Sequence, residues 1–207
     1  VFFVPGNHEY DGLPFEEADA RLRETCERLE ITFLHQRVVV MKGVRLIGCT
    51  LWSDFEALVP QHGPLTQQLK AREKAERAAN FYLRKTGTTF KGEAFLSDAV
   101  RAQAMADQAW LAQTLSEPFS GPTVVVTHFA PTLKSADPRY GLTPGTAGFC
   151  NALDHLLPKA NLWLHGHLHC AQDYVHMGCQ VAANPLGYAR KNEQLAFEPK
   201  KTWRISA

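Results

Sequence analysis

Four histidines directly follow two short apolar runs, 123–127 and 161–164; they are His128, His165, His167 and His169. Both runs are bounded by polar or turn residues, which is typical of buried strands. Imidazole is a common metal ligand and an acid or base near neutral pH. Ligand sites in open α/β sheets lie beyond the carboxyl ends of strands. The two runs therefore predict a polar site at one edge of a sheet.

The segment 165–169 places His167 and His169 two positions apart. On an extended chain such side chains point to the same face, and Gly166 allows the backbone to approach an ion closely. The pair can therefore grip one metal ion. Alternating histidines along a solvated sheet edge are at least as common for an isolated pair, and this second interpretation stays open.

A turn after the apolar run 1–4 carries a different set of groups, Asn7 and His8. A carboxamide oxygen is a neutral hard ligand, and an adjacent imidazole can act as a general acid. The structural alternative is that Asn7 takes a left-handed turn conformation and His8 is a plain surface residue.

Three segments in this order resemble the calcineurin-like metallophosphoesterases: Gly-Asn-His-Glu at 6–9, Val-Thr-His at 126–128 and Gly-His-Leu-His at 166–169. The segments 50–55 and 184–188 are similar to a bacterial cytoplasmic branch of that family. The resemblance covers nearly the whole chain. It implies an α/β fold, a four-layer α/β/β/α sandwich, with two divalent ions held by loops at the strand ends.

The resemblance also implies roles for five residues. Asn7, His128 and His167 would ligate one metal ion, and His169 the other. His8 would be the catalytic residue that steadies the transition state and protonates the leaving oxygen. The implied reaction is hydrolysis of a phosphate monoester or diester through a metal-activated hydroxide, with manganese, zinc or iron as the ion.

Further candidates are weaker, and the substrate-binding residues stay unknown. Trp52, Asp54 and Tyr188 are candidates to line the substrate mouth, although aromatic residues at strand ends are more often core. Tyr10 and Arg139 are candidate neighbours of the phosphate. His165 is expected to pack instead of ligating.

The family pattern also includes an Asp-x-His and a Gly-Asp motif upstream of the Gly-Asn-His-Glu turn. No aspartate here has histidine two positions on, and none follows glycine. We therefore expect an N-terminally truncated domain that holds one ion instead of two, because imidazoles and a carboxamide bring no negative charge to offset two dications. The alternatives are a degenerate, non-catalytic metal-binding or scaffold domain, and an ordinary α/β domain whose histidines are packed or solvated.

Length, net charge and cysteine content limit the class of protein. The chain has 207 residues and a net charge of +1, which predicts one domain over 1–207 and gives no field to attract nucleic acid. The five cysteines form no C-x-x-C pair and no apolar run reaches about 20 residues, so we expect a cytoplasmic protein with no membrane span. The expected partner is a small phosphorylated substrate, and an exposed sheet edge would favour an oligomer.

Apolar periodicity predicts the elements that position the site. It indicates helices at 15–29, 66–85 and 97–115, and hairpins at 38–49 and 172–183. The charge-rich helix lies within residues 60–95, which we expect to form a cap or arm, with Leu69, Phe81 and Leu83 on its inner side.

Overall fold

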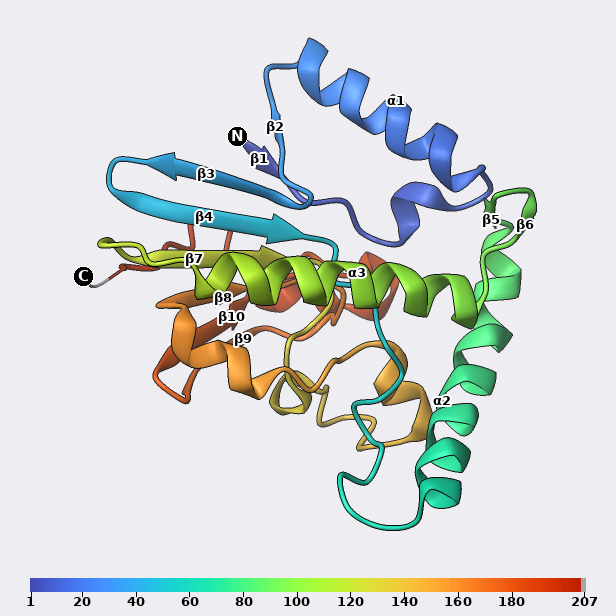
Figure 1. Ribbon diagram of the computed structural model, residues 1–207. Helices are drawn as coiled ribbons and strands as arrows, with labels where there is room; N and C mark the ends of the chain where they lie inside the picture. The colour runs from blue at the N-terminus through green and yellow to red at the C-terminus, as the bar shows by residue number, and fades with distance from the viewer. Residues whose placement is uncertain (206–207) are drawn as a thin grey trace.

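A computed structural model describes residues 1–205, and Figure 1 shows how its elements are arranged. The helices are α1 (Phe15–Arg28), α2 (Leu65–Thr86) and α3 (Ser97–Ser116). The strands are β1 (Phe2–Phe3), β2 (Thr32–Phe33), β3 (Arg37–Met41), β4 (Val44–Cys49), β5 (Thr89–Phe90), β6 (Glu93–Ala94), β7 (Thr123–Thr127), β8 (Leu162–Leu164), β9 (Gln172–His176) and β10 (Cys179–Ala183). Short 3₁₀ turns are η1 (His8–Tyr10), η2 (Leu133–Ser135), η3 (Pro144–Gly148), η4 (Asp154–Lys159), η5 (Ala189–Lys191) and η6 (Glu193–Ala196).

A six-stranded mixed sheet is the centre of the molecule, with the order β3-β4-β7-β8-β10-β9. The four inner strands are parallel, and each edge strand is the antiparallel arm of a hairpin. The inner strands therefore end at the same edge of the sheet, where His128 and the His165 segment leave β7 and β8. The helices and hairpins predicted from periodicity are confirmed, with bounds within a few residues.

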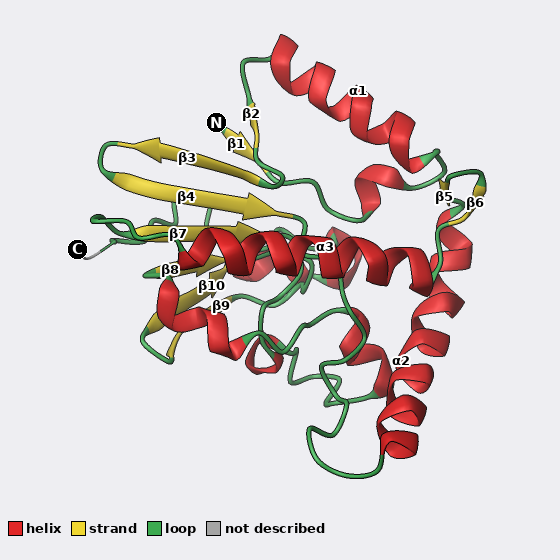
Figure 2. Cartoon of the chain, in the orientation of Figure 1, coloured by secondary structure: helices red, strands yellow, loops and turns green. Residues whose placement is uncertain are grey.

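Helix α3 and the turn η4 cover one face of this sheet, as Figure 2 shows for α3. Side chains of β4, β7 and β8 interdigitate there with α3, and Trp163 lies fully buried among them. The indole Nε1 of Trp163 donates to Thr127 Oγ1 at 3.0 Å, so its polar group is satisfied inside the core. This packing fixes the strand ends that carry the histidines.

The opposite face of the sheet is less covered. Its apolar side chains include Val44, Leu46, Val126 and Leu164, which are half-buried. The β1–β2 pair and α1 lie above β3 in Figure 1, and β5–β6 forms a second two-stranded piece. The α/β class is thus confirmed. The finer expectation of four layers stays a prediction.

Helix α2 lies along the side of the molecule and packs against η3 and α3. One detail of its prediction is wrong: Phe81 is 59% exposed and Leu69 is 45% exposed. The helix instead buries Ala75, with Ala79 and Leu83 beside it, because small side chains allow its close approach to the loops below. None of the helices within residues 1–205 is long and apolar enough to cross a membrane.

Candidate functional site

Three of the predicted ligands meet at one point, at the carboxyl edge of the sheet. His128 Nε2 lies 2.8 Å from Asn7 Oδ1 and 3.1 Å from His167 Nδ1, and the third side of the triangle, from Asn7 to His167, is 3.1 Å. We call Asn7, His128 and His167 the donor triad. Its members come from the turn after β1, the end of β7 and the loop after β8.

Backbone contacts at the strand ends hold the triad in place. The N–H groups of His128 and Phe129 donate to the Thr50 carbonyl at 3.2 and 3.1 Å, and the N–H of Gly166 donates to the His128 carbonyl at 3.1 Å. His167 adopts a left-handed conformation, with φ of 60°, which turns its ring back toward the triad.

Gly6 is required by the close approach of the turn to His128. A Cβ at Gly6 would lie 2.4 Å from His128 Cε1, so no larger residue fits without moving the ring. The Gly6 N–H donates to Glu9 Oε2 at 2.7 Å, and this bond fixes the turn.

Both imidazoles of the triad are kept neutral by burial. Burial lowers the pKa of His128 to about 3, and it lowers the pKa of His167 well below the usual range. Phe129 stacks on the His167 ring at 4.3 Å, which contributes to its desolvation. At neutral pH the site therefore presents uncharged nitrogen donors.

No arrangement of protons satisfies the three triad contacts. If both imidazoles donate to Asn7 Oδ1, their two N–H groups face each other at 3.1 Å. If the carboxamide is flipped and its NH₂ donates to both rings, two nitrogen lone pairs face each other instead. If one ring donates to the other, the accepting nitrogen turns its lone pair toward Oδ1, or the donating N–H meets the NH₂ of the flipped carboxamide. A cation between the three atoms satisfies every contact at once.

The spacing of the triad fits such a cation. Adjacent ligands of an octahedral ion with bonds of about 2.1 Å are about 3.0 Å apart, which matches separations of 2.8 to 3.1 Å. Within residues 1–205, no group of three or more His, Cys, Asp or Glu side chains is gathered to hold a metal. The triad has only two such residues, with a carboxamide as the third donor, and it carries no negative charge.

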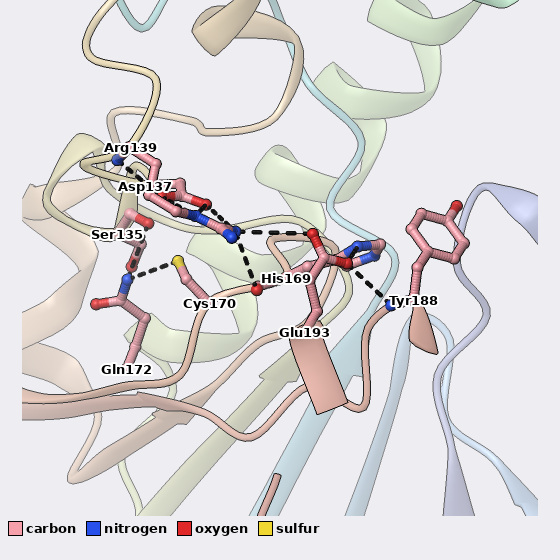
Figure 3. Close-up of polar contacts among 8 residues, drawn as sticks. All are labelled: Ser135, Asp137, Arg139, His169, Cys170, Gln172, Tyr188 and Glu193. Carbon is pink, nitrogen blue, oxygen red and sulfur yellow. Dashed lines mark hydrogen bonds and ion pairs between the residues drawn. The ribbon is translucent and has the colours of Figure 1, made fainter. Parts of the chain in front are cut away.

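His169 does not join the triad. Its Nδ1 lies 2.8 Å from Glu193 Oε2, and its ring meets the Tyr188 ring at 4.6 Å between centroids. Figure 3 shows Glu193 reaching from its short turn toward both His169 and Arg139. The expected ligand set is therefore divided into a triad and a separate histidine.

A series of ion pairs leads from Asp137 through Arg139 to Glu193, next to His169 (Figure 3). Arg139 binds Asp137 with Nη2 at 2.6 Å and Nε at 2.9 Å, and Nη2 lies 3.7 Å from Glu193 Oε1. The hydrogen bonds from Arg139 hold the pKa of Asp137 below its usual range. These pairs connect the loop after η2 with the C-terminal segment.

His8 stands at the exposed side of the site. Its Nδ1 lies 2.7 Å from Asp11 Oδ2, and its side chain is 60% exposed. Because the carboxylate can only accept, this contact places the ring proton on Nδ1.

A cavity of about 590 Å³ joins these groups. It is lined by residues of six segments: Asn7 and His8; Tyr82; His128; residues 136, 137, 139–141, 143, 146 and 149; residues 166–169; and residues 185–188 with Lys191 and Glu193. Of the weaker candidates, Arg139 and Tyr188 line it.

The other weak candidates are wrong as mouth or phosphate residues. Trp52 and Tyr10 are 2% and 1% exposed and pack in one aromatic cluster with Phe15. The Asp54 carboxylate is buried against Gln108 and caps the N–H of Glu56. His165 is buried as expected, with Nε2 at 2.9 Å from Ser135 Oγ.

Sequence reasoning missed Glu193 and Asp137. Neither lies near a strand end or a recognisable spacing, and only the fold brings them to the histidine motif. An acidic residue that follows an asparagine, as in Asn192-Glu193, is too common to be a signal.

No protein-family model matches the chain. A curated relative, an uncharacterised protein (L509) of Acanthamoeba polyphaga mimivirus, is 25% identical over 96% of this chain and 71% of its own length. Among solved structures, phosphopantetheinyl hydrolase (PptH) from Mycobacterium tuberculosis is similar with a TM-score of 0.64 and 20% identity, over 97% of this chain and 73% of that one. This likeness shows the fold.

Proposed function

We propose that this chain is a metal-dependent phosphoesterase of the calcineurin-like type. The observation that carries the proposal is the donor triad, whose three contacts no set of protons satisfies. The fold shared with a hydrolase named for its action on a phosphopantetheinyl group supports it. In this proposal the β1–β2 pair belongs to the second sheet of a four-layer sandwich, which would cover the half-buried face of the main sheet.

In the proposed mechanism, Asn7, His128 and His167 would hold one divalent ion, which could be manganese, zinc or iron. Such an ion lowers the pKa of water and neutralises charge on a phosphate. His169 offers a ligand toward a second ion.

His8 lies on the wall of the same cavity, where it can donate a proton to the leaving oxygen. Its contact with Asp11 through Nδ1 orients the ring and leaves Nε2 as the nitrogen for this step.

The cavity walls favour an ester with an apolar or aromatic part. Tyr82, Tyr140 and Leu186 line the cavity and are each at least 60% exposed, so a ligand can cover them. Aryl phosphate monoesters and diesters are therefore the first substrates to test, together with a phosphopantetheinyl compound.

The experiment measures metal content and hydrolysis on the same preparations. The chain is reconstituted with Mn²⁺ or Zn²⁺, desalted and analysed by plasma mass spectrometry, and hydrolysis of 4-nitrophenyl phosphate and its bis ester is followed. We expect about one ion or more per chain, and turnover that is lost in His8→Ala and kept in His62→Ala, an exposed histidine outside the cavity. Turnover that survives His8→Ala, or no retained ion, refutes the mechanism.

A second candidate is a non-catalytic metal-binding or scaffold domain. The neutral triad favours it, because no carboxylate among the described residues joins the triad to offset a second dication. Retained metal without turnover on either ester would select this function.

The remaining proposals concern the cellular compartment and the oligomeric state. We keep the cytoplasm as the expected compartment. An oligomer would form through the edge strand β3, where Val38, Val40 and Met41 are 40%, 59% and 47% exposed. Light scattering should show that the parent is an oligomer and that the Val40→Lys variant is a monomer. A monomeric parent contradicts the proposal.

A further inference from the structure

Glu193 is a carboxylate buried in an otherwise exposed segment. Its side chain is 2% exposed, whereas its neighbours Asn192 and Leu195 are exposed. A buried carboxylate requires donors on its oxygens. One oxygen, Oε2, accepts from the His169 ring at 2.8 Å and from the Tyr188 backbone N–H at 2.9 Å.

The contact with Glu193 determines which ring nitrogen of neutral His169 carries the proton. An ionised carboxylate has no hydrogen to give, so Nδ1 of His169 must be the donor. The lone pair of the neutral ring is then on Nε2. None of residues 1–205 forms a hydrogen bond with Nε2, and His169 lines the cavity beside the triad.

Close packing against Gly187 and the charge of Arg139 also hold the Glu193 side chain in position. A Cβ at Gly187, where φ is +65°, would lie 2.4 Å from the Cβ of Glu193, so only glycine allows this approach. Arg139 approaches the second oxygen, Oε1, at 3.7 Å and is itself anchored on Asp137. The carboxylate therefore has a donor or cation at each oxygen.

We propose that Glu193 is the positioning residue for His169, holding its ring in the Nδ1–H form with Nε2 presented to the cavity as a metal donor. The inference rests on the proposed function. Carboxylates that accept the second N–H of a ligating histidine commonly set its tautomer and raise its basicity. A purely structural role, in which Glu193 only fastens the C-terminal segment to the domain, makes a different prediction for the ring.

The first arm of the test reads the ring in the metal-free protein. Histidine ¹⁵N shifts are measured by NMR at about pH 8, above the ordinary imidazole pKa. We expect the Nδ1–H form of His169 in the parent and in Glu193→Gln, whose carboxamide oxygen can still accept. We expect conversion to the Nε2–H form or a mixture in Glu193→Ala, with the signals of buried His165 unchanged as the control for folding.

The second arm measures Zn²⁺ binding by calorimetry. We expect Glu193→Ala to weaken the binding that involves His169 by about 10- to 100-fold, with a smaller loss in Glu193→Gln. The matched control is Glu198→Gln, a 63% exposed carboxylate of the same segment that pairs with Lys201, and its affinity should equal that of the parent.

The two arms separate the two hypotheses. An unchanged His169 tautomer in Glu193→Ala, or parental Zn²⁺ affinity in that variant, overturns the role of Glu193 while the phosphoesterase proposal stands. A parent that binds no Zn²⁺ overturns the proposed function itself, and the positioning role with it. If Glu193→Ala does not fold, the reduced affinity expected of Glu193→Gln against Glu198→Gln decides the question.

Discussion

Gly6 and Gly166 both face the His128 ring, but at different distances, and this difference gives a sharp prediction. A Cβ at Gly6 would lie 2.4 Å from Cε1 and 2.6 Å from Nδ1 of His128, whereas a Cβ at Gly166 would lie 3.6 Å from Nδ1. The first distance is a severe overlap and the second is an ordinary contact. Gly6→Ala should therefore displace His128, and Gly166→Ala should not.

The size of the displacement follows from the overlap. To reach an ordinary contact of about 3.4 Å, the ring must retreat by about 1 Å from the position it has now. The distances of His128 Nε2 to Asn7 and His167, now 2.8 and 3.1 Å, would change by a similar amount. Three atoms so separated no longer share one ion, and we expect metal affinity to fall by about 100-fold. Overpacking should also cost about 1–3 kcal/mol of unfolding free energy.

The assay compares parent, Gly6→Ala and Gly166→Ala by Mn²⁺ calorimetry and by urea unfolding of the metal-free chain. Only Gly6→Ala should lose affinity and stability. Equal losses in both variants, or parental behaviour of Gly6→Ala, would refute the reasoning, because the close approach of the turn to the ring is its whole basis.

Three further predictions concern stability. Burial lowers the pKa of His165 to about 4, below the value of about 6.5 for an exposed imidazole. The native state therefore favours the neutral ring, and the unfolding free energy should fall by about 3 kcal/mol as the pH drops from above 6.5 to 4. Urea unfolding at pH 7 and 5 should show about 2 kcal/mol of this loss, and His165→Gln should reduce it. An equally large loss in that variant would assign the pH dependence to other groups. Asn7→Ala should weaken Mn²⁺ binding at least 10-fold while leaving the unfolding free energy of the metal-free chain unchanged or higher, because the unsatisfiable contacts disappear; a clear loss of metal-free stability would contradict this. Arg45 donates to the Glu117 carbonyl beyond α3 at 2.8 Å and to Thr123 Oγ1 at 3.1 Å; Arg45→Ala should lower the unfolding free energy by about 1–3 kcal/mol, and an unchanged urea midpoint would show that water replaces these bonds.

The main sheet was predictable from sequence because its strands have strong local signals. The run 123–127 is β-branched throughout, and both hairpins turn at a glycine, Gly43 and Gly178, with φ of 77° and 83°. The position of His128 at a strand end followed directly. The meeting of Asn7 with His128 and His167 was expected only from the family resemblance, because the periodicity of the chain says nothing of it.

The rest depended on tertiary contacts that leave no local pattern. Trp52 and Tyr10 are candidate site residues from the sequence, yet both pack into the aromatic cluster, since burying a large ring contributes more to stability than exposing it at a cavity mouth. Glu193 reaches His169 from 24 positions away through an irregular segment. The sequence of α2 predicted Leu69, Phe81 and Leu83 on its inner side, but the surface that the helix meets accommodates alanines and leaves Phe81 in solvent.

The sequence separation within the donor triad has a consequence for folding. Asn7 lies 121 positions from His128 and 160 from His167, so the three atoms meet only when the N-terminal turn has packed against the ends of β7 and β8. Partly folded chains cannot assemble the triad, and an ion bound there would stabilise the native state alone. At a free ion concentration 100 times the dissociation constant, this amounts to about 2.7 kcal/mol against global unfolding. Local opening of α2 or of β5–β6, which contribute no triad atom, would proceed as readily with the ion as without it.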